Sequence, residues 1–154
     1  MANYIKYDDV KVIISKGAGK TDAYIEQINE GFKMLISTNR PRRSEFVMAL
    51  IQYTPSENWT SFRKKAYNLE FDYTLADIRG VQLEIKDGSL NKIIDKRISG
   101  EPIGRYILPL SSWPVRSWGD IKEICFTVFL NEVESIAAAV EIRNLRLTSA
   151  LHDH

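Results

Sequence analysis

The side chains that could act as nucleophiles or metal ligands in this sequence are few. Cys125 is the only cysteine, which excludes an internal disulfide and a cysteine-only metal cluster. A nucleophilic cysteine also needs a nearby histidine, and the only histidines are His152 and His154 at the C-terminal end. We therefore interpret Cys125 as a small buried or half-buried thiol in a strand rather than as a catalytic group.

Residues 19–21 read Gly-Lys-Thr and match the end of a phosphate-binding loop. That motif also needs a glycine five residues before the Gly-Lys pair, between a buried strand and a helix. The residue at that position is Ile14, inside an apolar run. The sequence therefore does not predict a nucleotide site.

The elements that must position the remaining polar and aromatic side chains are strands. In residues 120–130, apolar residues at 124, 126 and 128 alternate with Glu123, Cys125 and Thr127. This period of two predicts a strand with one buried face and one wet face. Residues 140–147 alternate in the same way until Asn144, where the phase breaks, which predicts a bulge or bend.

Further strands are predicted at residues 9–15, 32–37, 45–53, 67–74, 80–86, 91–98 and 105–110. Asp87-Gly88 predicts a hairpin turn, and Pro109, which has no N–H, predicts a strand that lies at an edge or ends there. Residues 23–29 are interpreted as a short helix or a surface crossing. The sequence predicts an all-β fold, an antiparallel β-sandwich of the jelly-roll kind with two sheets and eight or nine strands. One domain would span residues 1–154, with its core at about 9–148.

Charge and hydropathy exclude several classes of partner. The net charge is +1, from 21 basic and 20 acidic residues, so we expect neither nucleic acid nor an anionic membrane as a partner. The sequence contains no run of about 18 apolar residues, so it does not predict a transmembrane helix. Residues 1–9 lack the apolar core of a signal peptide. Two locations stay open: the cytoplasm if Met1 is the native start, or the outside of the cell if this is a domain of an exported enzyme.

Short motifs along the chain carry a resemblance. Trp59 precedes a Leu-x-Phe-Asp strand at residues 69–72, a strand end at residues 110–113 reads Leu-Ser-Ser-Trp, and residues 121–126 and 140–147 close the pattern. This order resembles the jelly-roll carbohydrate-binding modules with a galactose-binding-domain-like fold, and within them family 11 and its relatives. The resemblance covers roughly residues 30–148 and rests largely on core residues.

The resemblance implies a groove on a concave sheet that would contain residues 45–53, 80–87, 91–98 and 122–130. Outward side chains there would include Gln82, Glu84 and Thr127, and Tyr53 would stand at the end of a strand. The loop after Trp113 would offer Arg116 and an exposed Trp118, while Trp59 would cover the sandwich. The expected ligand-binding residues are Tyr53, Gln82, Glu84, Arg116, Trp118 and Thr127.

The side-chain chemistry of this set suits a sugar. A sugar ring has flat C–H faces, which an aromatic ring such as Tyr53 or Trp118 can cover. It also has a rim of hydroxyl groups, which planar amide, carboxylate and guanidinium groups bind through paired hydrogen bonds. Gln82, Glu84 and Arg116 supply these groups.

Relatives of this kind commonly hold a structural calcium ion through an aspartate near the chain end. This sequence has Arg143 there, between Ile142 and Asn144. A guanidinium cannot ligate a cation, although Asp8 and Asp9 could still supply oxygens. We predict no metal site and no cofactor.

The favoured interpretation is a non-catalytic carbohydrate-binding module. It would bind an oligosaccharide or polysaccharide in the concave-sheet groove and, as part of a larger multidomain protein, target an attached enzyme to its substrate. The alternative is a β-sandwich protein-interaction or scaffolding domain that has lost sugar binding. An enzyme is not predicted, because a glycan hydrolase needs two carboxylates facing each other across a groove and nothing in the sequence pairs Glu84 with Glu123.

Overall fold

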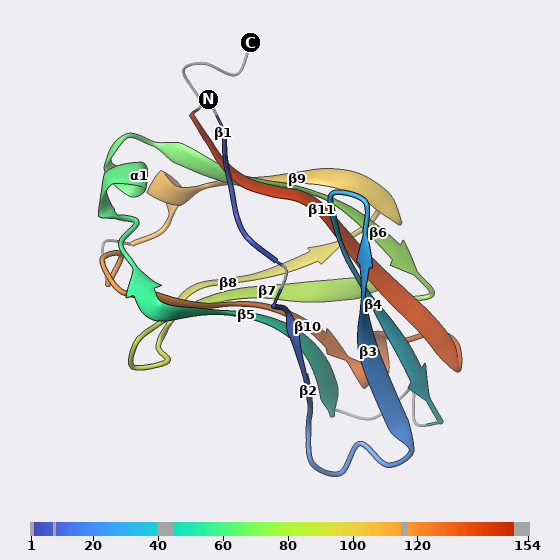
Figure 1. Ribbon diagram of the computed structural model, residues 1–154. Helices are drawn as coiled ribbons and strands as arrows, with labels where there is room; N and C mark the ends of the chain where they lie inside the picture. The colour runs from blue at the N-terminus through green and yellow to red at the C-terminus, as the bar shows by residue number, and fades with distance from the viewer. Residues whose placement is uncertain (1, 8, 40–44, 115–116, 150–154) are drawn as a thin grey trace.

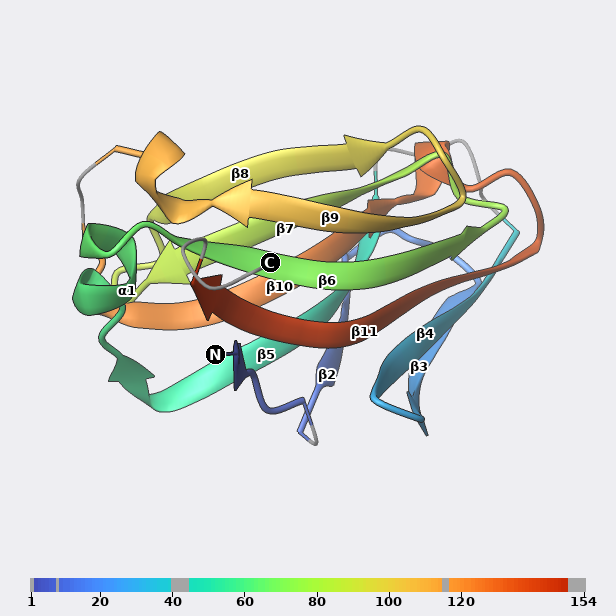
Figure 2. The ribbon, with the colours of Figure 1, turned by 90° about the horizontal axis from the view of Figure 1, so that it is seen from above.

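The alternating segments form two antiparallel sheets in the computed structural model, which describes residues 2–7, 9–39, 45–114 and 117–149. The six-stranded sheet has the order β3 (Thr21–Ile28), β4 (Gly31–Thr38), β11 (Ala137–Ser149), β6 (Tyr67–Ala76) and β9 (Ile103–Pro109), with β1 (Ala2–Tyr4) also paired to β11. The five-stranded sheet has the order β2 (Lys11–Ile14), β5 (Phe46–Glu57), β10 (Ile121–Phe129), β7 (Gly80–Asp87) and β8 (Lys92–Ser99). Figures 1 and 2 show the two sheets as stacked layers. The predicted antiparallel β-sandwich is confirmed.

Helical structure among the described residues is limited to short connections. These are α1 (Thr60–Lys64) and two 3-10 turns, Leu110–Ser112 and Leu130–Glu132. None of the helices in the described part of the chain is long and apolar enough to cross a membrane.

Three phenylalanines join the two sheets at the centre of the core. Phe126 of β10 packs edge-to-face against Phe71 of β6 and Phe32 of β4, with ring centroids 5.4 and 6.0 Å apart. All three side chains are fully buried. Burying an aromatic side chain of this size contributes about 1.5–3 kcal/mol to stability, so this contact holds the two layers together. The inward direction predicted for residues 124, 126 and 128 is confirmed.

Several local predictions are also confirmed. The four strands expected in one sheet, at residues 45–53, 80–87, 91–98 and 122–130, do lie together there. The hairpin at Asp87-Gly88 joins β7 to β8, and β9, which ends at Pro109, is an edge strand. The bulge near Asn144 is present: the register between β11 and β6 shifts there, and Asn144 has a φ of 54°.

The interpretation of residues 23–29 as a helix or surface crossing is wrong. Residues 23–28 belong to β3, which pairs with β4 along its whole length. As an edge strand, β3 buries only Ala23, so its sequence lacks the apolar alternation that identified the other strands. β3 and the three-residue β1 are additional to the eight or nine strands expected.

Candidate functional site

Two rows of side chains cross the side of the five-stranded sheet that faces away from the core, here called the outer face. The register gives one row as Met48, Thr127, Gln82 and Arg97. The neighbouring row is Leu50, Cys125, Glu84 and Asp95. Three of the expected ligand-binding residues, Gln82, Glu84 and Thr127, therefore lie next to one another. The outer face is apolar over β5 and polar over β7 and β8.

Glu84 is a buried carboxylate on the outer face. Its carboxylate accepts a hydrogen bond of 3.1 Å from the Thr127 hydroxyl and lies 2.6 Å from the Lys92 ammonium group. Glu84 is 6% exposed, and the hydrogen bond to Glu84 raises the pKa of Lys92 despite the opposing effect of burial. The middle of the outer face is thus a closed, internally satisfied polar contact.

An open hollow of about 250 Å³ lies at one end of the outer face, where Phe129, Gln82, Arg97 and Glu132 meet. Phe129 is 37% exposed and packs edge-to-face on Phe46 at 6.0 Å. The Arg97 guanidinium group donates to the Glu132 carboxylate, and Gln82 donates to Asp95. The hollow combines a partly exposed aromatic ring with amide, guanidinium and carboxylate groups.

Gly80 leaves room for this arrangement. A Cβ atom at this position would lie 2.7 Å from Arg97 Nη2 and 2.7 Å from Glu132 Oε2. That separation is shorter than a van der Waals contact, so any side chain larger than hydrogen would displace the ion pair. The glycine therefore helps to shape the floor of the hollow.

Phe129 and Arg97 were not identified from the sequence. Phe129 continues the outward series formed by Glu123, Cys125 and Thr127, so extending the period of two by one step would have found it. Arg97 lies on β8 opposite Gln82, and this requires the strand register, which the sequence alone does not give.

The exposure expected for Trp118 is wrong. Trp118 is 2% exposed, and its indole N–H donates to the carbonyl oxygen of Pro114 at 2.9 Å. The Arg63 guanidinium carbon lies 5.7 Å from the centre of the indole ring and covers it. The ring is buried under Arg63, so it presents no sugar-binding platform. Arg116 lies outside the described residues.

Tyr53 is separated from the other expected site residues. It follows Ile51 on the core-facing side of β5, and its ring packs edge-to-face on Trp59 at 6.5 Å. Trp59 is itself 1% exposed, so the expected structural role of Trp59 is confirmed. Tyr53 lines a different cavity, at the open edge between the sheets.

The groups that could perform catalysis on the outer face are engaged or inactive. Burial raises the pKa of the Cys125 thiol to about 12, so the thiol is protonated and a poor nucleophile at neutral pH. Glu84 is held by Thr127 and Lys92, and Glu123 accepts a hydrogen bond of 3.3 Å from Gln52. Neither carboxylate faces the other across an open groove.

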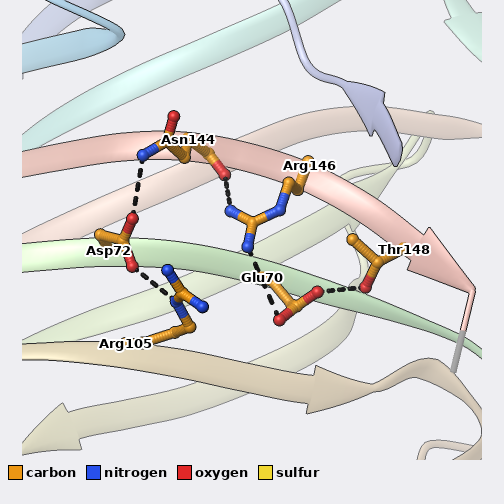
Figure 3. Close-up of polar contacts among 6 residues, drawn as sticks. All are labelled: Glu70, Asp72, Arg105, Asn144, Arg146 and Thr148. Carbon is orange, nitrogen blue, oxygen red and sulfur yellow. Dashed lines mark hydrogen bonds and ion pairs between the residues drawn. The ribbon is translucent and has the colours of Figure 1, made fainter. Parts of the chain in front are cut away.

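A second polar cluster lies on the outward side of the six-stranded sheet (Figure 3). Its members, contributed by β6, β9 and β11, are Glu70, Asp72, Arg105, Asn144, Arg146 and Thr148. Asp72 accepts hydrogen bonds from Arg105 at 2.8 Å and Asn144 at 2.9 Å, and Thr148 donates to the buried Glu70. Burial alone would raise the pKa of Asp72, but these bonds and the charges of Arg105 and Arg146 lower it. The groups satisfy one another, which is typical of structural support.

The residues near Arg143 do not fit a calcium site. Arg143 lies 2.6 Å from Glu141 in an ion pair, and its guanidinium group cannot ligate a cation. Within residues 2–7, 9–39, 45–114 and 117–149, no three histidine, cysteine or acidic side chains gather in a way that could hold a metal ion. Asp8 lies outside these residues.

Comparison with solved structures identifies the fold. The family 11 carbohydrate-binding module of a cellulosomal cellulase of Clostridium thermocellum gives a TM-score of 0.66 at 15% identity, covering 100% of this chain and 98% of that chain. The family 30 carbohydrate-binding module of another cellulosomal cellulase of Clostridium thermocellum gives 0.61 at 12% identity, covering 100% and 99%. An exo-β-agarase gives 0.60 at 13% identity, and the match covers 90% of this chain but only 23% of the agarase.

No family model and no curated protein matches the sequence. At the identities above, the solved structures show that the chain has the fold of family 11 and family 30 carbohydrate-binding modules. The resemblance found in the sequence motifs is confirmed at this level. The agarase match also shows that such a sandwich can form about a quarter of a longer chain.

Proposed function

We propose that this chain is a non-catalytic carbohydrate-binding module that binds an oligosaccharide or polysaccharide across its outer face. The observation that carries the proposal is the hollow at the end of that face. There the partly exposed ring of Phe129 lies beside the Gln82 amide, the Arg97 guanidinium group and the Glu132 carboxylate. These are the two kinds of group that a sugar ring requires.

Each group has a distinct role in this proposal. The Phe129 ring covers a C–H face of one sugar unit and removes apolar area from water. Gln82, Arg97 and Glu132 bind the hydroxyl rim, where charged donors and acceptors make the stronger hydrogen bonds. The chain of sugars continues over Thr127 and Glu84 toward Lys92, along the polar half of the outer face. A shallow site of this kind gives modest affinity because its contacts are few and wet.

A targeting role within a larger protein follows from the same proposal. The family 11 and family 30 modules with a similar fold are named as modules of cellulases, and the similar region of the agarase is a minor part of that enzyme. We infer that this chain works as one module that holds an attached enzyme close to a polysaccharide. Because Glu84 and Glu123 are each held by other side chains, the module itself supplies no pair of acid and base.

Affinity electrophoresis in gels containing soluble polysaccharides, together with a glycan array, tests the proposal. The wild type should be retarded by one class of polysaccharide, and Phe129→Ala should weaken that binding roughly three- to tenfold. Tyr24→Ala is the matched control, since Tyr24 is 57% exposed on β3 of the other sheet. Equal retardation of the wild type and Phe129→Ala would show that the hollow is not part of the binding site.

A protein-interaction domain remains the second candidate, on one observation. Ile13 and Ile14 of the edge strand β2 are 42% and 38% exposed, and Ile13 lies next to Met48 on the apolar half of the outer face. The exposed side chain of Ile13 extends the apolar half of the outer face to the sheet edge, which favours contact with another protein. A folded wild type that binds no glycan in the screen would favour this candidate over the module.

A further inference from the structure

The open edge of the sandwich contains a second cavity, here called the edge pocket, with a volume of about 650 Å³. It lies between β1 and the last part of β5, away from the hollow on the outer face. Its walls include Tyr4, Lys6, Asp9, Tyr53, Glu57 and Phe62. Pockets of roughly 300–1,000 Å³ that combine apolar walls with a few polar groups are typical of small-molecule sites. We propose that the edge pocket binds a single neutral sugar unit, such as the end of a glycan chain, independently of the outer face.

Aromatic rings supply the apolar walls of the edge pocket. Tyr4 is 67% exposed, an unusual position for a large aromatic side chain without a partner surface. Phe62 packs on Tyr67 at 5.1 Å, and Tyr53 packs on Trp59 at 6.5 Å, so both of these rings are held in place from behind. Rings that are fixed before binding cover a sugar face at little cost in side-chain entropy.

The lining of the edge pocket supplies two polar atoms that could bind a ligand. One is the hydroxyl of Tyr53, whose pKa is raised by burial and by the charge of Glu57, so the hydroxyl stays protonated and can donate. The other is Oε2 of Glu57, whose Oε1 already accepts a hydrogen bond of 3.2 Å from the Trp59 indole. One donor and one charged acceptor, placed beside aromatic rings, match adjacent hydroxyls on a sugar ring.

The charges of the lining select against other ligands. The charged residues of the lining are one cation, Lys6, and two anions, Asp9 and Glu57, so the pocket carries an excess of negative charge and does not attract a phosphate or sulfate group. A wholly apolar ligand would cover the Tyr53 hydroxyl and the Glu57 carboxylate without hydrogen bonds, which is unfavourable. The choice of a sugar over another neutral polar ligand rests on the proposed function of the chain. The inference that the edge pocket binds a small polar ligand does not depend on that function.

Nitrogen–proton correlation NMR of the 154-residue chain tests the proposal. The probes are glucose, galactose, mannose and xylose, each added separately, with choline as a cationic comparison. At least one sugar should shift the backbone amide signals of Tyr4, Tyr53 and Glu57. Tyr53→Phe keeps the ring on Trp59 and should weaken that binding about three- to tenfold, the effect of one lost hydrogen bond. Tyr24→Phe, on β3 and outside the lining of the pocket, should leave it unchanged.

The alternative outcomes separate this proposal from the proposed function. Shifts confined to Gln82, Arg97 and Phe129 would overturn the edge pocket and leave the outer face as the sugar site. Shifts around Tyr53 with choline alone would overturn the sugar assignment. The titration is then repeated with the polysaccharide that retards the chain in the affinity gel. If neither the single sugars nor this polysaccharide shifts the signals of Tyr4, Tyr53 and Glu57, the edge pocket is not a sugar site, whatever the outer face binds.

Discussion

Glu84 illustrates at the scale of single residues how the outer face is held together. Its carboxylate belongs to the outward row of β7, yet it is nearly as buried as a core side chain. A carboxylate in that position is stable only if hydrogen-bond donors and a positive charge replace the lost water. Thr127 supplies the donor and Lys92 the charge. The same contact fixes the side chains that border the proposed sugar path.

Removal of the Thr127 hydroxyl is therefore expected to destabilise the fold. Thr127→Val keeps the shape of the side chain but leaves Glu84 with one donor fewer, and it should lower the free energy of unfolding by about 1–2 kcal/mol. Urea unfolding followed by tryptophan fluorescence measures this change. Thr74→Val is the control, because Thr74 lies on the outward side of β6 in the other sheet. An equal effect of the two substitutions would contradict the importance of the Thr127–Glu84 bond.

Asp87, at the turn between β7 and β8, should make stability depend on pH. Burial alone would raise its pKa, but hydrogen bonds from Asn91, Ser117 and Ser89 lower it. A carboxyl group whose pKa is lower in the folded state stabilises the fold above its unfolded pKa and loses this contribution as the pH falls through its folded pKa. Wild-type stability should thus decrease in acid, and Asp87→Asn should show a weaker decrease.

Urea unfolding at several values between about pH 5 and pH 2 measures the pH dependence. Asp87→Asn keeps an oxygen that can accept the backbone N–H bonds of Ser89 and Asn91, both 2.9 Å, so the turn should still form. Asp77→Asn, at an exposed turn, is the matched control. If Asp87→Asn and the wild type lose stability in parallel, Asp87 does not contribute to the acid response.

Residue type alone predicted exposure poorly in the candidate site. Trp118 follows a polar stretch of sequence, but its ring is buried, covered by Arg63, and its N–H donates to the carbonyl oxygen of Pro114. Phe129, an apolar residue at the end of a strand, is partly exposed because the alternation directs it outward. Gln82, Glu84 and Thr127 were placed together correctly, since strand periodicity and pairing govern their direction. Loop side chains obey no such rule.

At the scale of elements, the bulge in β11 is the feature that the strand patterns predicted most specifically. Asn144 adopts a left-handed conformation with a φ of 54°, and its backbone N–H donates to the carbonyl oxygen of Glu30 at 2.9 Å. Its side chain donates to Asp72, so the bulge is tied both to the β3–β4 turn and to β6. The polar cluster in Figure 3 surrounds this position and stabilises it.

Substitutions of Asn144 should separate the backbone requirement from the hydrogen bond. Asn144→Val places a β-branched side chain at a positive φ and removes the bond to Asp72, so it should lower the free energy of unfolding by about 2–3 kcal/mol. Asn144→Gly loses the bond but accepts the conformation, and it should cost about 1 kcal/mol. Thermal unfolding compares the two variants. A glycine variant as unstable as the valine variant would contradict the role of the left-handed conformation.

Strands that alternate because one face is buried were predicted from the sequence, whereas β1 and β3 were not. β6, β7 and β10 alternate because one side of each packs on the core. β3 and β1 lie at the margin of the six-stranded sheet, so few of their side chains are buried and no periodicity develops. The missed elements matter for function, because β1 forms one wall of the edge pocket.

At the scale of the whole molecule, the two ends of the described chain lie in one sheet and the proposed sugar face lies in the other. β1 pairs with the end of β11, where Ala2 is opposite Thr148, so the described ends lie side by side (Figure 1). The outer face belongs to the five-stranded sheet, in the other layer (Figure 2). An attached domain would therefore leave the outer face open to a polysaccharide.

This arrangement predicts the effect of fusing a folded reporter protein to the chain. A fusion to either end should leave retardation by the polysaccharide gel unchanged within about twofold, since neither end lies in the five-stranded sheet. The N-terminal fusion should instead weaken binding of a single sugar to the edge pocket, because β1 contributes Tyr4 to that wall. Affinity electrophoresis and NMR titration of both fusions measure the two effects. Loss of gel retardation in both fusions, with the free chain retarded, would place the polysaccharide site near the chain ends instead.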